Sequence, residues 1–209
     1  MADKPGDFFV GIIDFFGILV PGAVLLYLQG RLLSDYLGLY YSTDSTVQWV
    51  VFAVGSYVAG HFVMGISVVL NRFHGLFYSE AKDPFYSEAE KSISLPANVP
   101  HNRTNVFYRA FAFVRLKGPS ALAEIERQMA EYKMFRSLTL VFALDFAIQA
   151  AINSTWWFRV ALSLLLSLAA ARRFLYLLNW TRRITFEYYA LLHSGGSEGQ
   201  QDKKDPLIE

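Results

Sequence analysis

The chain has 209 residues, of which 54% are hydrophobic, 16% are aromatic and only 18% are charged, and its formal net charge is +1. A soluble domain carries about 25% charged residues, so this composition is typical of a membrane protein. The near-neutral charge argues against direct nucleic-acid binding, because nucleic-acid-binding domains carry a strong basic excess. The sequence contains no cysteine, which excludes disulfides, thiolate nucleophiles and thiolate metal ligands.

Four apolar stretches are candidates for membrane-spanning helices, which need roughly 20 residues. The first two are Phe8–Gln29 and Val47–Leu70, and the shorter third and fourth are Ser137–Ile152 and Trp156–Ala171. Residues 153–155 alone separate the last two stretches, which therefore form a helical hairpin. The first stretch is too long, and its leader too weakly basic, for a signal peptide. The sequence thus predicts an all-α, polytopic membrane protein with four transmembrane helices.

The distribution of positive charge predicts the orientation, because cytoplasmic loops carry an excess of Lys and Arg. If both termini are cytoplasmic, all of the 19 Lys and Arg residues except Arg31 and Arg159 belong to the cytoplasmic side. Three tryptophans, Trp49, Trp156 and Trp157, then fall at the outer boundary, where an aromatic belt is expected. We predict a bacterial inner (cytoplasmic) membrane protein with both termini cytoplasmic and the lipid bilayer as its first partner.

Breaks in the pattern divide the chain into four parts. Residues 1–70 form an N-terminal transmembrane hairpin, 71–119 a cytoplasmic loop with short helices, 120–193 a long helical hairpin that contains spans three and four, and 194–209 a disordered tail. The loop repeats the sequence FYSEA at Phe77–Ala81 and Phe85–Ala89, as a local duplication or as a repeated docking element. Its segment Asn105–Lys117 has helical spacing and basic residues, and it either packs on the protein or lies on the membrane surface.

Spans three and four are expected to continue beyond the membrane. No Pro or Gly occurs between Ala121 and Ile152, and a helix of that length measures roughly 48 Å. The sequence therefore predicts that spans three and four extend into a cytoplasmic helical hairpin stalk. Folding the hairpin at its turn sets two acidic residues level with two basic ones, and such exposed pairs contribute roughly 0–1 kcal/mol each. The four residues are Glu124, Glu126, Arg182 and Arg183.

Ionisable residues within membrane spans are costly, and they normally face protein or water. Four occur here: Asp14, His61, Asp145 and Arg159. Their depths along the helices predict two contacts, one between Asp14 and His61 and one between Asp145 and Arg159. The second pair begins two stripes spaced by four residues, which are Asp145, Gln149 and Asn153 in span three and Arg159, Ser163 and Ser167 in span four.

Three interpretations of these polar residues stay open. Small and polar residues line helix contacts in membranes, so the stripes fit a tightly packed four-helix bundle. They also fit a hydrated path within a homo-oligomer. A proton relay through Asp14, His61 and Asp145 is the third interpretation. Pro21 and Gly22 in the first span mark a candidate hinge.

The sequence contains no phosphate-binding loop, dinucleotide fingerprint, zinc motif or nucleophile elbow. The four histidines are scattered, and the sequence indicates no cofactor and no enzyme. In layout, the chain resembles the small multi-span proteins of bacterial anti-phage systems. We therefore expect an oligomeric membrane protein that forms or gates an ion path, or perturbs the membrane as a defence effector. The alternative is a passive membrane anchor or scaffold that recruits a soluble cytoplasmic partner.

Overall fold

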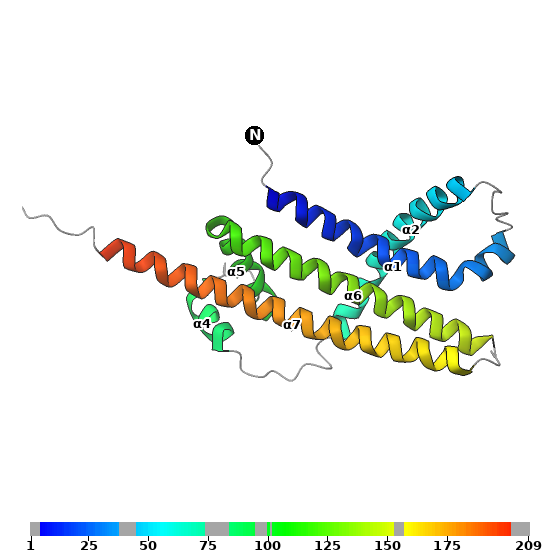
Figure 1. Ribbon diagram of the computed structural model, residues 1–209. Coiled ribbons are helices and arrows are strands. Elements are labelled where there is room, and N and C mark those ends of the chain that lie inside the picture. The colour runs from blue at the N-terminus through cyan, green and yellow to red at the C-terminus, as the bar shows by residue number, and fades with distance from the viewer. Residues whose placement is uncertain are drawn as a thin grey trace, which may run out of the picture. The chain divides into compact units, whose positions relative to one another are not determined.

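The computed structural model describes residues 5–37, 45–73, 84–94, 100, 102–152 and 157–201 (Figure 1). Within these residues the regular structure is entirely helical, which confirms the predicted all-α class. The elements are α1 (Pro5–Leu37), α2 (Ser45–Ser67), a 3₁₀ segment η1 (Val68–Phe73), α4 (Pro84–Ser92), α5 (Arg103–Lys117), α6 (Pro119–Ala151) and α7 (Trp157–Gln201).

The chain folds into two compact units, and each is described separately below. Unit 1 comprises Met1–Tyr78 and Arg127–Leu178, and unit 2 comprises Ser79–Glu126 and Asn179–Glu209. The predicted parts had boundaries at residues 70, 119 and 193, whereas the compact units divide the helices α6 and α7 themselves. Each of these two long helices thus contributes one segment to each unit.

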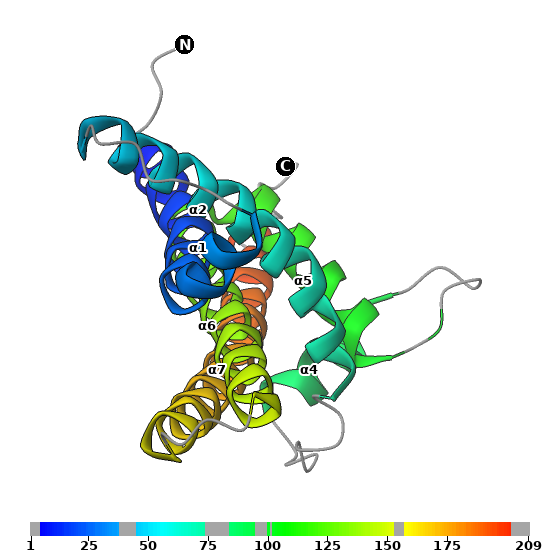
Figure 2. The same cartoon turned by 90° about the vertical axis from the view of Figure 1, so that its right-hand side faces the viewer.

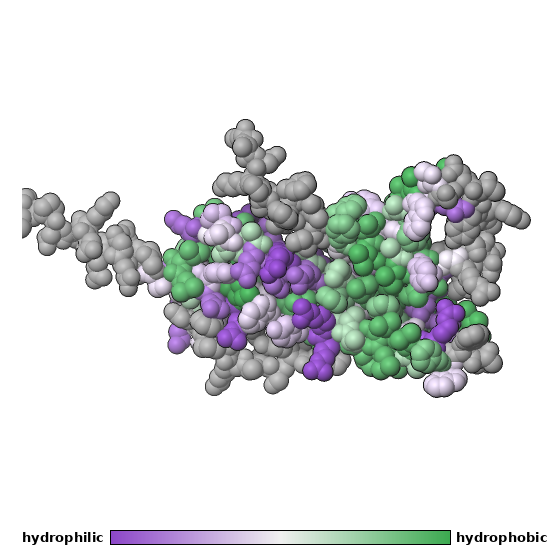
Figure 3. Space-filling view, in the orientation of Figure 1, coloured by the Kyte–Doolittle hydropathy of each residue, from purple (hydrophilic) through white to green (hydrophobic). Residues whose placement is uncertain are grey.

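Three helical segments are long and apolar enough to cross a membrane, namely Thr46–Asn71, Pro119–Ala151 and Trp157–Ser194. A fourth and shorter apolar stretch, Asp14–Gly30, lies within α1. Side chains such as Val51, Phe62 and Leu165 are large, apolar and exposed in unit 1. Figure 3 shows apolar side chains gathered over α7 near the turn that joins it to α6. Helices of this length and composition, with such a surface, indicate a membrane location.

The helices α1 and α2 of unit 1 cross at very close range (Figure 1, Figure 2). A Cβ atom added at Gly22 would lie 1.8 Å from the carbonyl oxygen of Ser56, and one added at Gly60 would lie 2.0 Å from that of Ile18. Both glycines therefore permit backbone contact between the helices, as small residues do in membrane interfaces. Gly22 had been predicted as part of a hinge with Pro21. The hinge stays a prediction, because the structure shows only that both residues are buried at this crossing.

Unit 2 has a core of its own. Three residues spaced by four on α5, Val106, Ala110 and Val114, are fully buried, as helical periodicity requires of an inward face. Ile125 of α6 and Phe186 of α7 are fully buried in the same unit. The Phe186 ring meets the ring of Phe107 on α5 and that of Tyr86 on α4, with centroids 6.1 and 5.4 Å apart.

Several local predictions can be compared with these helices. The helix α5 begins at Arg103, where the Asn102 side chain caps it by accepting a bond from the Asn105 backbone N–H at 2.9 Å. The second FYSEA copy lies in α4, whereas the first lies outside the described residues. The predicted tail began at Ser194, but α7 continues to Gln201, so that start was placed too early. Residues 202–209 lie outside the described part of the chain.

Candidate functional site

Asp145 lies at the junction of three helices in unit 1. Its side chain sits on α6, and the residue is only 3% exposed. One carboxylate oxygen accepts a hydrogen bond from Nε2 of Gln29 on α1 at 2.9 Å. The other oxygen accepts a short hydrogen bond from the hydroxyl of Ser163 on α7. A single carboxylate therefore links α1, α6 and α7.

The hydrogen bonds explain how a carboxylate is tolerated in an apolar helix. A buried carboxylate without partners would be strongly destabilising, and hydrogen bonds to an ionised acceptor are about twice as strong as neutral ones. One polar atom at this site has no such hydrogen bond. Oε1 of Gln29 is buried and has no hydrogen-bond partner among the described residues. The site thus holds an acceptor beyond those that the three side chains use with one another.

A second contact between α6 and α7 lies near this junction. The hydroxyl of Ser167, one turn after Ser163, donates to the backbone carbonyl of Thr139 at 3.2 Å. Both serines are buried. Three members of the predicted polar stripes, Asp145, Ser163 and Ser167, are therefore brought together, and all three join helices of the same chain.

The remaining members of the stripes are placed differently. The predicted contact between Asp145 and Arg159 does not form, since Arg159 is exposed and Asp145 bonds to Gln29 and Ser163 instead. Ser163 lies one helical turn beyond Arg159, and this turn of α7 presents a serine to α6. Gln149 is half-buried, and Asn153 lies outside the described residues.

The predicted contact between Asp14 and His61 does not form either. The Asp14 carboxylate lies 4.0 Å from Nζ of Lys133 on α6. His61 on α2 is exposed, and its ring packs against that of Tyr57 with centroids 4.6 Å apart. Asp14 shares a face of α1 with Gly17, whose ideal Cβ would lie 3.6 Å from the Ala130 carbonyl oxygen of α6. Asp14 therefore faces α6, and its pairing with His61 was wrong for that reason.

A second polar cluster in unit 1 joins α6 to the end of α2. Arg136 is 4% exposed, and its Nε donates to Oγ of Ser67 at 3.1 Å while Nη1 donates to Oδ1 of Asn71 at 3.3 Å. The hydroxyl of Ser137 lies 3.3 Å from that of Ser67. The sequence reasoning missed this cluster because it counted Arg136 among the basic residues of the cytoplasmic side and sought no partner for it within the spans. The sequence pattern that could have revealed the cluster is the pair Arg136 and Ser137 at the start of an apolar stretch.

The acidic residue Glu124 of unit 2 has a different partner from the one predicted. Its Oε2 accepts a hydrogen bond from the hydroxyl of Tyr188 at 2.7 Å. The guanidinium of Arg183 lies 5.9 Å from the ring centroid of Trp180. The predicted register set Glu124 and Glu126 level with Arg182 and Arg183. The observed bond therefore shifts the partner of Glu124 about one and a half turns along α7.

Comparison with known proteins adds no relative to these observations: no family model, no curated protein and no solved structure matches the chain. Among the described residues, no three His, Asp or Glu side chains gather as metal ligands would. The polar junction at Asp145 and the cluster at Arg136 are the two buried polar clusters that these observations describe in unit 1.

Proposed function

We propose that this protein is a four-span protein of the bacterial inner membrane, with both termini cytoplasmic, that recruits a soluble cytoplasmic protein. In this proposal α1, α2, α6 and α7 each cross the membrane, and α6 and α7 continue as a helical hairpin stalk. The observation that carries it is the separate core of unit 2, in which Val106, Ile125 and Phe186 are almost fully buried. A membrane anchor that recruits no partner would not need a second folded unit.

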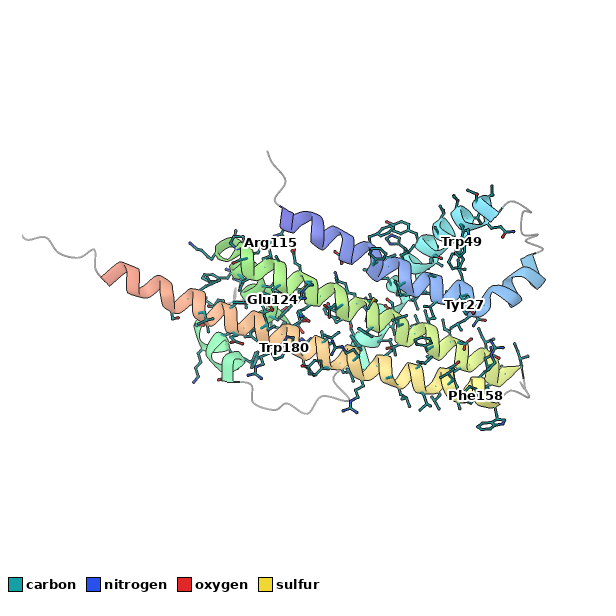
Figure 4. All side chains as sticks on the ribbon, in the orientation of Figure 1. Tyr27, Trp49, Arg115, Glu124, Phe158 and Trp180 are labelled. Carbon is teal, nitrogen blue, oxygen red and sulfur yellow. The ribbon has the colours of Figure 1, made fainter. Side chains whose placement is uncertain are left out.

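Exposed aromatic side chains support the assignment of the spans. Tyr27, Trp49 and Trp157 are each more than two-thirds exposed, and Phe158 is nearly so. In Figure 4 the labelled Tyr27, Trp49 and Phe158 lie towards one end of unit 1. Aromatic residues gather at membrane boundaries, so this grouping supports the proposal that α1 crosses the membrane as the longer apolar helices do.

The outer face of α5 is the surface that we assign to the partner. Tyr108, Arg109, Ala112, Arg115 and Leu116 are exposed on this helix, opposite the buried valines and alanine described above. The helix contains no acidic residue. An exposed surface with aromatic, apolar and positive side chains is complementary to an acidic protein surface, which it would attract and orient.

The experiment that tests the proposal is site-specific photo-crosslinking in living cells. A photo-crosslinking amino acid at Ala112 samples the outer face of α5, and one at the exposed Leu191 of α7 serves as the control within unit 2. We expect one discrete soluble adduct from position 112 that is weakened when Arg109 and Arg115 are both changed to Glu. Equal adducts from both positions, or an adduct that survives the double charge reversal, would exclude this face as the recruiting surface.

A second candidate function is supported by the polar junction. A homo-oligomer that forms or gates an ion path, or that perturbs the membrane as an anti-phage effector, would place Asp145 near the conducting route. The buried Oε1 of Gln29 favours this candidate, because it adds an unused acceptor beside a carboxylate. It ranks second because Asp145, Ser163 and Ser167 already join helices within one chain.

Ion flux through liposomes that contain the purified protein separates the two candidates. The ion-path candidate requires flux that Asp145→Asn abolishes, whereas neutralising an exposed charge on α4, in Lys91→Gln, should leave that flux intact. If the protein serves recruitment alone, we expect no ion flux from the wild type or from either variant, because the membrane spans then serve only to hold unit 2 at the membrane.

A further inference from the structure

We infer that Arg136 is the centre of a binding site for a phosphate group at the membrane boundary, filled by the headgroup of an anionic phospholipid. This inference rests on the span boundaries proposed above, but it does not depend on a soluble partner.

The positive charge of Arg136 lacks a described counter-charge. Its two hydrogen-bond acceptors are the hydroxyl of Ser67 and the amide oxygen of Asn71, and both are neutral. Among the described residues no carboxylate is found within salt-bridge distance of its guanidinium, and the nearby Asp14 carboxylate lies 4.0 Å from Nζ of Lys133 instead. A buried charge without an opposite charge is costly. An anion bound from outside the chain would remove that cost.

The guanidinium is held in a fixed orientation. The Ser67 hydroxyl donates to the carbonyl oxygen of Met64 at 2.8 Å, which leaves its lone pairs for Nε of Arg136. The Nη1 end reaches Asn71, whose side chain is exposed. These two bonds use two of the five guanidinium N–H donors, and the three that remain belong to Nη1 and Nη2, the nitrogens on the side of Asn71. Planar guanidinium donors of this kind bind phosphate oxygens in pairs.

The position along the helices favours a lipid over free phosphate. Arg136 directly precedes the apolar stretch of α6, and exposed Val68 and Val69 precede Asn71 on η1. The guanidinium of Arg173 on α7 lies 5.9 Å from the ring centroid of Phe135, which places a second cation at this level. Basic pockets between helices at the cytoplasmic boundary are typical sites for anionic headgroups. The phosphate layer of a bilayer supplies such groups at that depth.

The test measures binding to the full-length protein purified in a neutral detergent. Thermal unfolding midpoints are recorded with added phosphatidylglycerol, with phosphatidylcholine and with inorganic phosphate, and native mass spectrometry counts the lipids that remain bound. We expect wild-type protein to bind phosphatidylglycerol about tenfold more tightly than phosphatidylcholine. Arg136→Gln should abolish this preference, whereas Arg159→Gln, a change at an exposed arginine, should preserve it.

A second variant keeps the test decisive if Arg136→Gln does not fold. Asn71→Asp places a carboxylate where the amide oxygen now lies 3.3 Å from Nη1, at an exposed position that tolerates charge. It supplies the missing counter-charge from within the chain, so we expect a stable protein that has lost its preference for phosphatidylglycerol.

Three other results are informative. Equal binding of both lipids by the wild type would overturn the site. A preference that persists in Asn71→Asp would overturn the assignment to Arg136. Stabilisation by inorganic phosphate equal to that by phosphatidylglycerol would confirm a phosphate site and overturn the lipid as its source. None of these measurements involves α5, so failure here is distinguishable from failure of partner recruitment.

Discussion

Asp145 shows how one polar residue can fix the packing of three helices. Its carboxylate satisfies a donor from α1 and a donor from α7. Replacing it with leucine would strand both Gln29 and Ser163 in an apolar setting, and each buried unsatisfied group costs about 1–3 kcal/mol. Asparagine retains an acceptor of similar size. We therefore expect Asp145→Leu to lower the free energy of unfolding in detergent by several times more than Asp145→Asn does.

A control variant separates the contribution of the Asp145 carboxylate to stability from that of its hydrogen-bond donor Ser163. Ser163→Ala removes one donor but leaves Asp145 bonded to Gln29, so its effect should be smaller than that of Asp145→Leu. Denaturation of the purified protein by sodium dodecyl sulfate, followed by circular dichroism, gives all three values. A leucine variant as stable as the wild type would show that the junction contributes nothing to the fold.

The polar residues of unit 1 show which features of the site could be predicted from the sequence. It identified Asp145, Ser163 and Ser167 because polar residues are rare in apolar stretches, but it gave Asp145 the partner Arg159. Depth along a helix follows directly from the rise per residue, whereas the direction in which a side chain points depends on how the helices are rotated. That rotation is set by packing, and Gln29 was missed because it stands at the end of the predicted first span.

At the scale of elements, the crossing of α1 and α2 depends on the absence of two side chains. A methyl group at Gly22 or Gly60 would overlap the backbone of the facing helix at about 2 Å, and backbone cannot move aside as a flexible side chain can. Overpacking of a well-packed interior costs about 1–3 kcal/mol or more. We expect Gly22→Ala and Gly60→Ala each to lower the thermal unfolding midpoint of the protein in detergent.

The chain offers a matched control on the same helix. Gly65 of α2 has no heavy atom within 4 Å of its ideal Cβ position, so Gly65→Ala should leave the midpoint unchanged or raise it slightly, since alanine favours helix over glycine. If all three variants behaved alike, helix propensity rather than close packing would govern this hairpin.

The long helices were the most predictable elements. The lack of Pro and Gly between Ala121 and Ile152 predicted a helix that the structure forms as α6, from Pro119 to Ala151. The end of α7 was less predictable, because Gly195 and Gly196 suggested a break after Ser194. A glycine lowers helix stability by only about 1 kcal/mol. Such a bias is weak, and α7 extends past it to Gln201.

At the scale of the whole molecule, the proposed topology predicts which positions are accessible from outside the membrane, and cysteine labelling can test this. The chain contains no cysteine, so a single introduced cysteine is the only thiol. We expect a membrane-impermeant maleimide to label Thr46→Cys and Ile152→Cys from outside intact spheroplasts. Ala2→Cys, Ser94→Cys and Ser194→Cys should react only after the membrane is permeabilised, because the proposal places them in the cytoplasm.

Each alternative topology gives its own labelling pattern, so the experiment decides between them. If only α2, α6 and α7 cross the membrane, Ala2→Cys is labelled from outside while Ser94→Cys stays protected. If all four helices cross in the opposite orientation, every position reverses. Protection of both Thr46→Cys and Ser94→Cys would place α2 within the cytoplasm and remove the first hairpin from the bilayer. The predicted pattern therefore requires α1 to span the membrane, although its described apolar stretch, Asp14–Gly30, is shorter than the other three.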